Sequence, residues 1–338
     1  MSDIALLIIS LGIILIGAEL FVNGVEWVGK LFNLSEGAVG SVLAAVGTAL
    51  PETIIPIIAI VFGSGAVGKD IGIGAILGAP LMLSTLAMFV TGVAVYAFKR
   101  RRRAGTKVHG DYSSMSRDLG FFMIVFTAAI LAGTIPPQMR NWQLLIAVLM
   151  ILAYVWYVHT MLSQERDLES ETDIPPCYFA RGHKTPPLLR VGGQVLIALL
   201  CIIMGADLFV HSIKVVALNY GVPAFVLALI ITPIATELPE KFNSVIWISR
   251  EKDTLALGNI TGAMVFQSSL IPALGIFLTD WQLSSGAFLS ALIALAASAV
   301  LYFHLISKKH VTASMLLLCG VFYAVFLGAV FSGIITGI

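Results

Sequence analysis

Ten apolar stretches follow one another along this chain, and each is long enough to cross a bilayer as a helix of about 20 residues. Only 12% of the residues are charged, about half the share typical of a soluble domain. The polar breaks are too short to hold a folded soluble domain, so the sequence predicts an all-α polytopic membrane protein. The expected spans are 4–31, 36–62, 71–98, 119–135, 142–162, 190–219, 223–249, 254–278, 284–306 and 311–336.

The basic residues are unevenly distributed between the two sides of the predicted membrane. Of the 20 Lys and Arg residues, 16 lie in loops after odd-numbered spans and 2 in loops after even-numbered spans. Basic loops stay in the cytoplasm. We therefore expect a multi-pass protein of the cell (inner) membrane with both termini outside the cytoplasm. The basic run 99–103 is explained by this topology, and neither a separate lipid-binding role nor a nucleic-acid partner is expected for it.

The second half of the chain repeats the first. Residues 17–52 align without a gap on 205–240, with ten of the 36 pairs identical, and 74–86 align on 258–270, with six of 13 identical. Each half contains five predicted spans, an odd number, so the second copy must enter the membrane from the opposite side. Inverted repeats are the architecture of many secondary transporters.

The repeat predicts two inverted five-helix halves, residues 1–162 and 190–338, joined by a cytoplasmic linker. The linker, residues 163–189, is rich in charge and proline and is expected to be flexible.

The segment GTALPE at residues 47–52 places a carboxylate beside a proline in an apolar span. Thr48 and Glu52 are four residues apart, which puts the hydroxyl and the carboxylate on one face of a helix. Pro51 has no N–H, so the carbonyl of Gly47 loses its helical partner. An intramembrane carboxylate costs at least about 2.5 kcal/mol to insert and is a candidate for function.

The segment ATELPE at residues 235–240 repeats this arrangement in the second half. Thr236 and Glu240 share one face, and Pro239 frees the carbonyl of Ala235. Carboxylate, hydroxyl and carbonyl oxygens are the ligands that Ca²⁺ prefers. We therefore expect two broken helices from the inverted copies to meet and build one cation site near the membrane midplane.

With these motifs the chain resembles the cation/Ca²⁺ exchanger superfamily, particularly its compact sodium/calcium exchanger members. In that family each repeat carries a GTSLPE-like segment and a downstream GNxxGSNxx(N/D) segment. The resemblance implies that Glu52 and Glu240 hold the central divalent ion, and that Thr48, Thr236 and nearby carbonyls share its ligation. It implies inorganic cations and the bilayer as partners, no cofactor and no obligate protein partner.

The downstream segments depart from the family pattern. GAILGAPLML at 74–83 has lost both asparagines and the serine, whereas the second copy keeps Asn259 and has Gln267 where the family places Asn or Asp. Gln267 is therefore a candidate ligand. Neighbouring hydroxyls offer further oxygens, although such hydroxyls often bond their own helix; they belong to Ser84, Thr85, Ser268 and Ser269.

The second PE motif also carries two extra charges. Glu237 replaces the family serine, and Lys241 follows four residues later. We favour an internal ion pair between them, because an unpaired buried charge is costly. The alternative is that Lys241 occupies part of the cation site as a tethered surrogate for a coupling ion. With Glu52 and Glu240, the formal charge at the site is −2, which suits one divalent or two monovalent ions.

We expect an antiporter that exchanges Ca²⁺ for Na⁺ by alternating access, and no enzyme, since the sequence has no nucleophile–base constellation. Two alternatives stay open. A proton-coupled or otherwise divergent cation exchanger fits the extra carboxylate, because a buried carboxylate can carry a proton. A non-transporting membrane module that keeps the fold fits the lost asparagines.

Overall fold

The computed structural model describes residues 3–32, 49–63, 65–164, 175–182 and 185–335. Its helices are α1 (Asp3–Leu31), α3 (Leu50–Phe62), α4 (Gly65–Met82), α5 (Met88–Phe98), α6 (Tyr112–Ala132), α7 (Arg140–Gln164), α8 (Leu188–Tyr220), α9 (Ala224–Ser249), α10 (Asp253–Leu278), α11 (Ser285–Lys308) and α12 (Ala313–Phe331). A π-helical turn, Leu83–Ala87, joins α4 to α5. Two short strands, β1 (Lys107–Val108) and β2 (Val311–Thr312), pair with each other.

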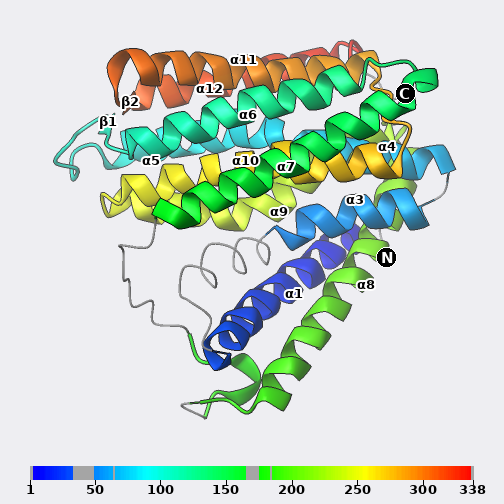
Figure 1. Cartoon of the computed structure of the whole chain (residues 1–338), viewed down its shortest axis with the longest axis horizontal. Coiled ribbons are helices and arrows are strands. Elements are labelled where there is room, and N and C mark those ends of the chain that lie inside the picture. Colours follow the sequence, from blue (N-terminus) through cyan, green and yellow to red (C-terminus); the bar gives the residue numbers. More distant parts are fainter. Residues whose placement is uncertain (1–2, 33–48, 64, 165–174, 183–184, 336–338) are drawn as a thin grey trace.

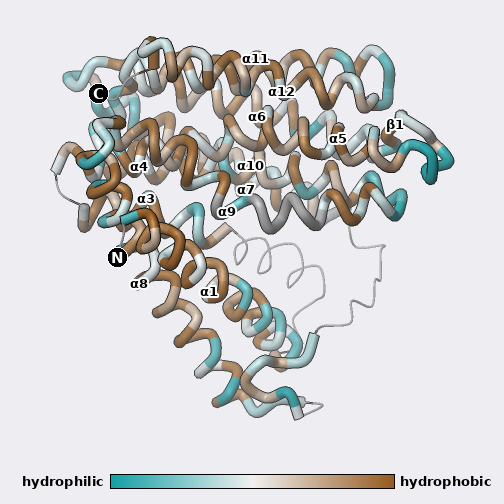
Figure 2. The backbone as a smooth tube through the Cα atoms, turned by 180° about the vertical axis from the view of Figure 1, so that it is seen from behind, coloured by the Kyte–Doolittle hydropathy of each residue, from teal (hydrophilic) through white to brown (hydrophobic). Residues whose placement is uncertain are grey.

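Eight helical segments of the described chain are long and apolar enough to cross a membrane, with α4 and α5 counted together as Gly65–Phe98. The two other expected spans are present as shorter apolar helices, Leu50–Phe62 and Ala224–Ile234. The first follows residues that lie outside the described part, and the second becomes polar from Thr236 onward. Figure 2 shows apolar colour along the helices and hydrophilic colour at the loops. The prediction of a polytopic helical membrane protein is confirmed.

The helices form two groups (Figure 1). α4–α7 and α9–α12 run side by side in one bundle, while α1 and α8 form a separate pair that crosses obliquely below it, next to α3. α1 begins and α12 ends on the same side of the molecule, opposite the end that carries β1 and β2.

α1 and α8 pack closely and antiparallel through repeat-matched residues. A Cβ added at Gly17 would lie 2.8 Å from Cγ1 of Ile202, and one added at Gly205 would lie 2.8 Å from Cγ1 of Ile14. Gly17 and Gly205 occupy equivalent positions of the repeat, as do Ile14 and Ile202. The contact is therefore reciprocal, and only glycine permits this approach.

Part of the predicted flexible linker is anchored on this helix pair. The carbonyl of Pro175 accepts hydrogen bonds from Asn23 Nδ2 (3.2 Å) and Trp27 Nε1 (2.9 Å). Gln194 is fully buried; it donates to Asn23 Oδ1 (3.0 Å) and accepts from the Cys177 thiol (3.2 Å). Because these buried polar groups satisfy one another, residues 175–180 pack on the α1–α8 pair.

Three loops are tied together at the end of the bundle that carries the strands. Arg102 donates two hydrogen bonds to Asp253 (2.7 and 2.6 Å), both side chains being buried, and a third to the carbonyl of Ile248 (2.8 Å). The β1–β2 pairing joins the same loop to the α11–α12 turn. We call these three loops, residues 99–111, 249–253 and 308–312, the loop platform. Arg102 therefore has a structural role that topology alone does not explain.

Candidate cation site

Four helices, α3, α4, α9 and α10, pack together, and each contacts the other three. They also contain every interior proline of the described helices: Pro56, Pro80, Pro233, Pro239 and Pro272. Each proline deprives the carbonyl four residues earlier of its helical partner. At membrane depth such carbonyls need another partner or line a cavity. They belong to Glu52, Ile76, Leu229, Ala235 and Ser268.

The predicted ligands on α9 and α10 lie near the middle of their helices. At 1.5 Å per residue, Thr236 is about 18 Å from the start of α9 and about 20 Å from its end. Gln267 is about 21 Å and about 17 Å from the two ends of α10. Both positions therefore fit a site near the midplane of a hydrocarbon layer about 30 Å thick.

α4 and α9 approach each other so closely that no side chain fits between them. A Cβ at Gly78 would lie 2.3 Å from the Leu229 carbonyl oxygen and 2.6 Å from Cγ of Pro233. One at Gly74 would lie 2.5 Å from the carbonyl oxygen of Phe225. The carbonyl that Pro233 frees is thus directed at α4, where it helps to fix the register of the two helices.

Glu52 lies in the first turn of α3 and is only 5% exposed. α3 begins at Leu50, so Pro51 occupies a first-turn position where its missing N–H costs nothing. The N-terminus of a helix favours a carboxylate. The sequence had placed Glu52 well inside a longer span. Its predicted neighbours Gly47 and Thr48 lie outside the described residues.

Thr236 and Glu237 are buried side by side on α9, with exposed fractions of 4% and 2%. The Thr236 hydroxyl donates to the carbonyl of Thr232 at 3.0 Å. Its lone pairs therefore stay available to a cation. α9 remains helical through Pro239, so the expected helix break at this motif was wrong.

Three further predicted positions lie on α9. The backbone of Ala235, Glu240 and Lys241 is helical, but their side chains lie outside the described part. The pairing of Lys241 with Glu237 therefore stays a prediction.

Gln267 is buried on α10, 2% exposed, and its Oε1 accepts no hydrogen bond from the described residues. The hydroxyl oxygen of Thr232, also 2% exposed, likewise has no partner within the described chain. A buried polar atom without a partner is costly and calls for an unseen ligand or water. From the sequence alone, Thr232 is not identified as a candidate ligand. The sequence feature that could have indicated it is the position of its hydroxyl, one helical turn before Thr236.

The neighbouring hydroxyls bond their own helices in the same way in both halves. In the first half, the carbonyl of Leu81 accepts hydrogen bonds from the hydroxyls of Ser84 and Thr85. In the second half, the carbonyl of Val265 accepts hydrogen bonds from the hydroxyls of Ser268 and Ser269. These side chains are buried and support the helices next to the site.

The structure thus brings Glu52, Thr236, Glu237 and Gln267 onto three helices that pack together, all of them buried. Among the described residues, no group of three His, Cys, Asp or Glu side chains is close enough to hold a metal ion.

The chain matches the sequence profile of a family described as sodium/calcium exchanger protein over residues 2–162 and 191–332. It is 25% identical over 289 residues to the putative antiporter CaxA of Alkalimonas amylolytica, covering 81% of this chain and 80% of that protein. The crystal structure of an H⁺/Ca²⁺ exchanger, CAX, superposes with a TM-score of 0.76 at 17% identity, covering 98% of this chain and 82% of the other. The sodium-calcium exchanger NCX_Mj superposes with a TM-score of 0.58 at 18% identity, covering 97% and 98%. At these identities the two structures show a shared fold.

Proposed function

The chain belongs to the sodium/calcium exchanger protein family, and on that premise we propose that it exchanges Ca²⁺ for Na⁺ by alternating access at a midplane site. As a member it is a multi-pass membrane transporter of cations and not an enzyme. The observation that carries the proposal is the burial of Glu52 at the N-terminus of α3, in the helix cluster that also buries Thr236, Glu237 and Gln267.

In this proposal Glu52 and Glu240 hold the Ca²⁺ ion. Thr48 and Thr236 contribute hydroxyl oxygens, the carbonyls of Gly47 and Ala235 add backbone oxygens, and Gln267 adds its amide oxygen; these residues are the ones the two repeats and the family resemblance single out. Support comes from the unpartnered Oε1 of Gln267. The formal charge of three Glu and one Lys, −2, matches one Ca²⁺ or two Na⁺.

We propose that the architecture is ten helices in two inverted halves, residues 1–162 and 190–338, joined by the linker 163–189. The reciprocal contact of Gly17 and Gly205 supports it. So does the packing of matched helices: α10 contacts α6 and α7, while α4 and α5 contact α11 and α12. Basic residues are concentrated at the end of the molecule that carries β1 and β2, which supports a cytoplasmic location for that end. In this proposal the protein lies in the inner or plasma membrane, and both termini lie outside the cytoplasm.

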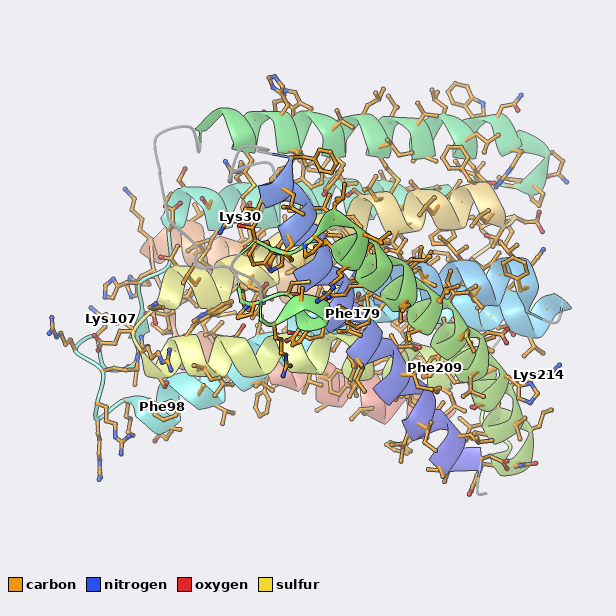
Figure 3. The ribbon with its side chains drawn as sticks, turned by 90° about the horizontal axis from the view of Figure 1, so that it is seen from below. Lys30, Phe98, Lys107, Phe179, Phe209 and Lys214 are labelled. Carbon is orange, nitrogen blue, oxygen red and sulfur yellow. The ribbon has the colours of Figure 1, made fainter. Side chains whose placement is uncertain are left out.

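The moving part in this proposal is the α1–α8 pair. Its contact with α3, α4 and α9 is an apolar cluster in which Ile14 and Phe209 pack with Ile55 and Ala228. Figure 3 shows Phe209 on α8 where this helix crosses the bundle. An apolar contact has no directional bonds to break. The pair can therefore slide over the core and open the site to either side.

A second candidate, proton-coupled exchange, is favoured by one observation. Glu237 is a buried carboxylate at a position where the other repeat has Ala49. A carboxylate can take up and release a proton, which the family hydroxyl at that position cannot.

The test is ⁴⁵Ca²⁺ uptake by proteoliposomes, driven separately by a Na⁺ gradient and by a pH gradient. We expect uptake under the Na⁺ gradient, and loss of uptake in Glu52→Gln and Glu240→Gln. Asp280→Asn is the matched control, because its exposed carboxylate lies outside the cluster and only pairs with Lys69. Uptake driven by the pH gradient alone would establish the proton-coupled alternative. Absence of uptake under both gradients, from protein shown to be folded, would contradict exchange and favour a non-transporting module.

A further inference from the structure

The loop platform gathers exposed cations from three separate parts of the chain. Figure 3 shows Phe98 and Lys107 at this end of the molecule and Lys214 at the other. The exposed cations are Arg100, Arg101, Arg103, Lys107, Arg250, Lys252, Lys308 and Lys309. The exposed carboxylates of the same loops are Asp111 and Glu251. The platform therefore has a large excess of positive charge.

Both exposed carboxylates already have partners. The Glu251 carboxylate accepts a hydrogen bond from the backbone N–H of Arg103. Asp111 caps α6 and accepts from the Ser114 hydroxyl, which holds the pKa of Asp111 below its usual value. These two carboxylates offset only part of the positive charge of the loops.

The membrane topology requires basic residues on one side, but it does not require them to be held in place. Here the buried Arg102–Asp253 pair and the β1–β2 ladder fix the three loops relative to one another. His109 also donates its backbone N–H to Asp253 at 2.9 Å. A buried ion pair is a weak source of stability but a good device for fixing register. The cations are therefore displayed on a preorganised surface.

Exposed apolar side chains adjoin the platform on the helices that enter and leave it. Tyr96 is 54% exposed in the last turn of α5, and the Lys99 ammonium lies 3.7 Å from the centre of its ring. Ile246, Leu255 and Ile306 are likewise exposed in the turns next to the loops. A surface that is cationic at its end and apolar along its sides fits a molecule with an anionic head and an acyl tail.

We propose that the loop platform binds the headgroups of anionic phospholipids in the leaflet that it faces. Clusters of four to eight Lys and Arg next to membrane helices attract anionic lipid headgroups. The neighbouring apolar side chains favour a lipid over a soluble polyanion, which would have no use for them. This inference does not depend on which cation the protein exchanges.

The experiment titrates the purified full-length chain in neutral detergent with dioleoyl phosphatidylglycerol or dioleoyl phosphatidylcholine, and follows the thermal midpoint of unfolding. A lipid that binds the folded state raises this midpoint. The platform variant is Arg101→Gln/Lys107→Gln/Lys252→Gln/Lys308→Gln. The control variant removes the same charge from exposed cations elsewhere, as Lys30→Gln/Lys69→Gln/Arg181→Gln/Arg190→Gln.

We expect the wild type to prefer phosphatidylglycerol, the platform variant to lose at least about tenfold in affinity for it, and the control variant to keep its affinity. Equal losses in both variants would show that only net charge matters and would overturn the proposal. So would equal stabilisation by the two lipids. Equally strong binding of glycerophosphoglycerol, the headgroup without acyl chains, or of a single-stranded oligonucleotide would identify a soluble anion as the ligand instead.

Discussion

Gly78→Ala is the sharpest test of how α4 positions the site on α9. The new Cβ would lie 2.3 Å from the Leu229 carbonyl oxygen, whereas ordinary contact begins at 3.4 Å. One helix must therefore move by about 1 Å, because a backbone carbonyl cannot rotate out of the way as a side chain can. Overpacking of this kind costs about 1–3 kcal/mol, offset by about 1 kcal/mol from replacing a helical glycine with alanine. We expect a net loss of up to about 2 kcal/mol in the free energy of unfolding.

The functional loss should exceed what this destabilisation explains. Gly78 contacts Pro233, less than one helical turn from Thr236, and a displacement of about 1 Å in a positioned group can cost about 100-fold in rate. We expect Na⁺-driven ⁴⁵Ca²⁺ uptake to fall at least about tenfold in protein that is still folded.

The matched control is Gly328→Ala on α12. Within the described chain, a Cβ at Gly328 meets nothing within 4 Å. Its uptake should stay at the wild-type rate, with stability unchanged or raised by up to about 1 kcal/mol. Wild-type uptake and stability in Gly78→Ala would refute the argument that the close approach of α4 and α9 fixes the site.

Three further predictions follow from buried or capping charges. Glu52→Asp keeps the charge but shortens the side chain by one methylene, so the carboxylate moves away from the proposed ion. The apparent KM for Ca²⁺ should therefore rise at least about tenfold in the uptake assay. An unchanged KM would show that Glu52 does not touch the ion. Arg102→Met should lower the free energy of unfolding by about 3–5 kcal/mol, because it leaves the Asp253 carboxylate buried without its cation, and Arg102→Met/Asp253→Leu should recover most of this loss in denaturant titrations. Asp111→Ala should cost about 1 kcal/mol at neutral pH through the lost cap of α6. Since hydrogen bonding lowers the pKa of Asp111 from its ordinary value of 3.8, the stabilisation is present above that value and is lost as the pH falls through the folded pKa, so the thermal midpoints of variant and wild type should converge in acid.

The sequence predicts those parts of the structure that depend on composition and repetition. Apolar length identifies the helices. The offset of 188 residues predicts that Gly17 and Gly205 occupy equivalent places, and their reciprocal contact supports this. The buried state of Glu52, Glu237 and Gln267 follows from their position within apolar stretches.

Contacts between distant segments could not be predicted in this way. The role of Arg102 depends on Asp253, 151 residues later, and a count of basic residues cannot separate it from its exposed neighbours. The anchoring of Cys177 depends on a buried glutamine on α8 that has no local signal. α9 stays helical through Pro239, whereas local rules for proline predict a break.

The reciprocal contact between α1 and α8 is that of an isologous dimer within one chain. In a homodimer with two-fold symmetry, residue i contacts residue j of the partner, and residue j contacts residue i. In the same way, Ile14 contacts Gly205, and Ile202, the repeat equivalent of Ile14, contacts Gly17. A substitution at a true homodimer interface is always present in both copies. Here each half can vary alone, and the chain does so at the proposed site, where Ala49 occupies the repeat position that corresponds to Glu237. Two repeats within one chain can thus keep a symmetric contact surface while the proposed ion site becomes asymmetric.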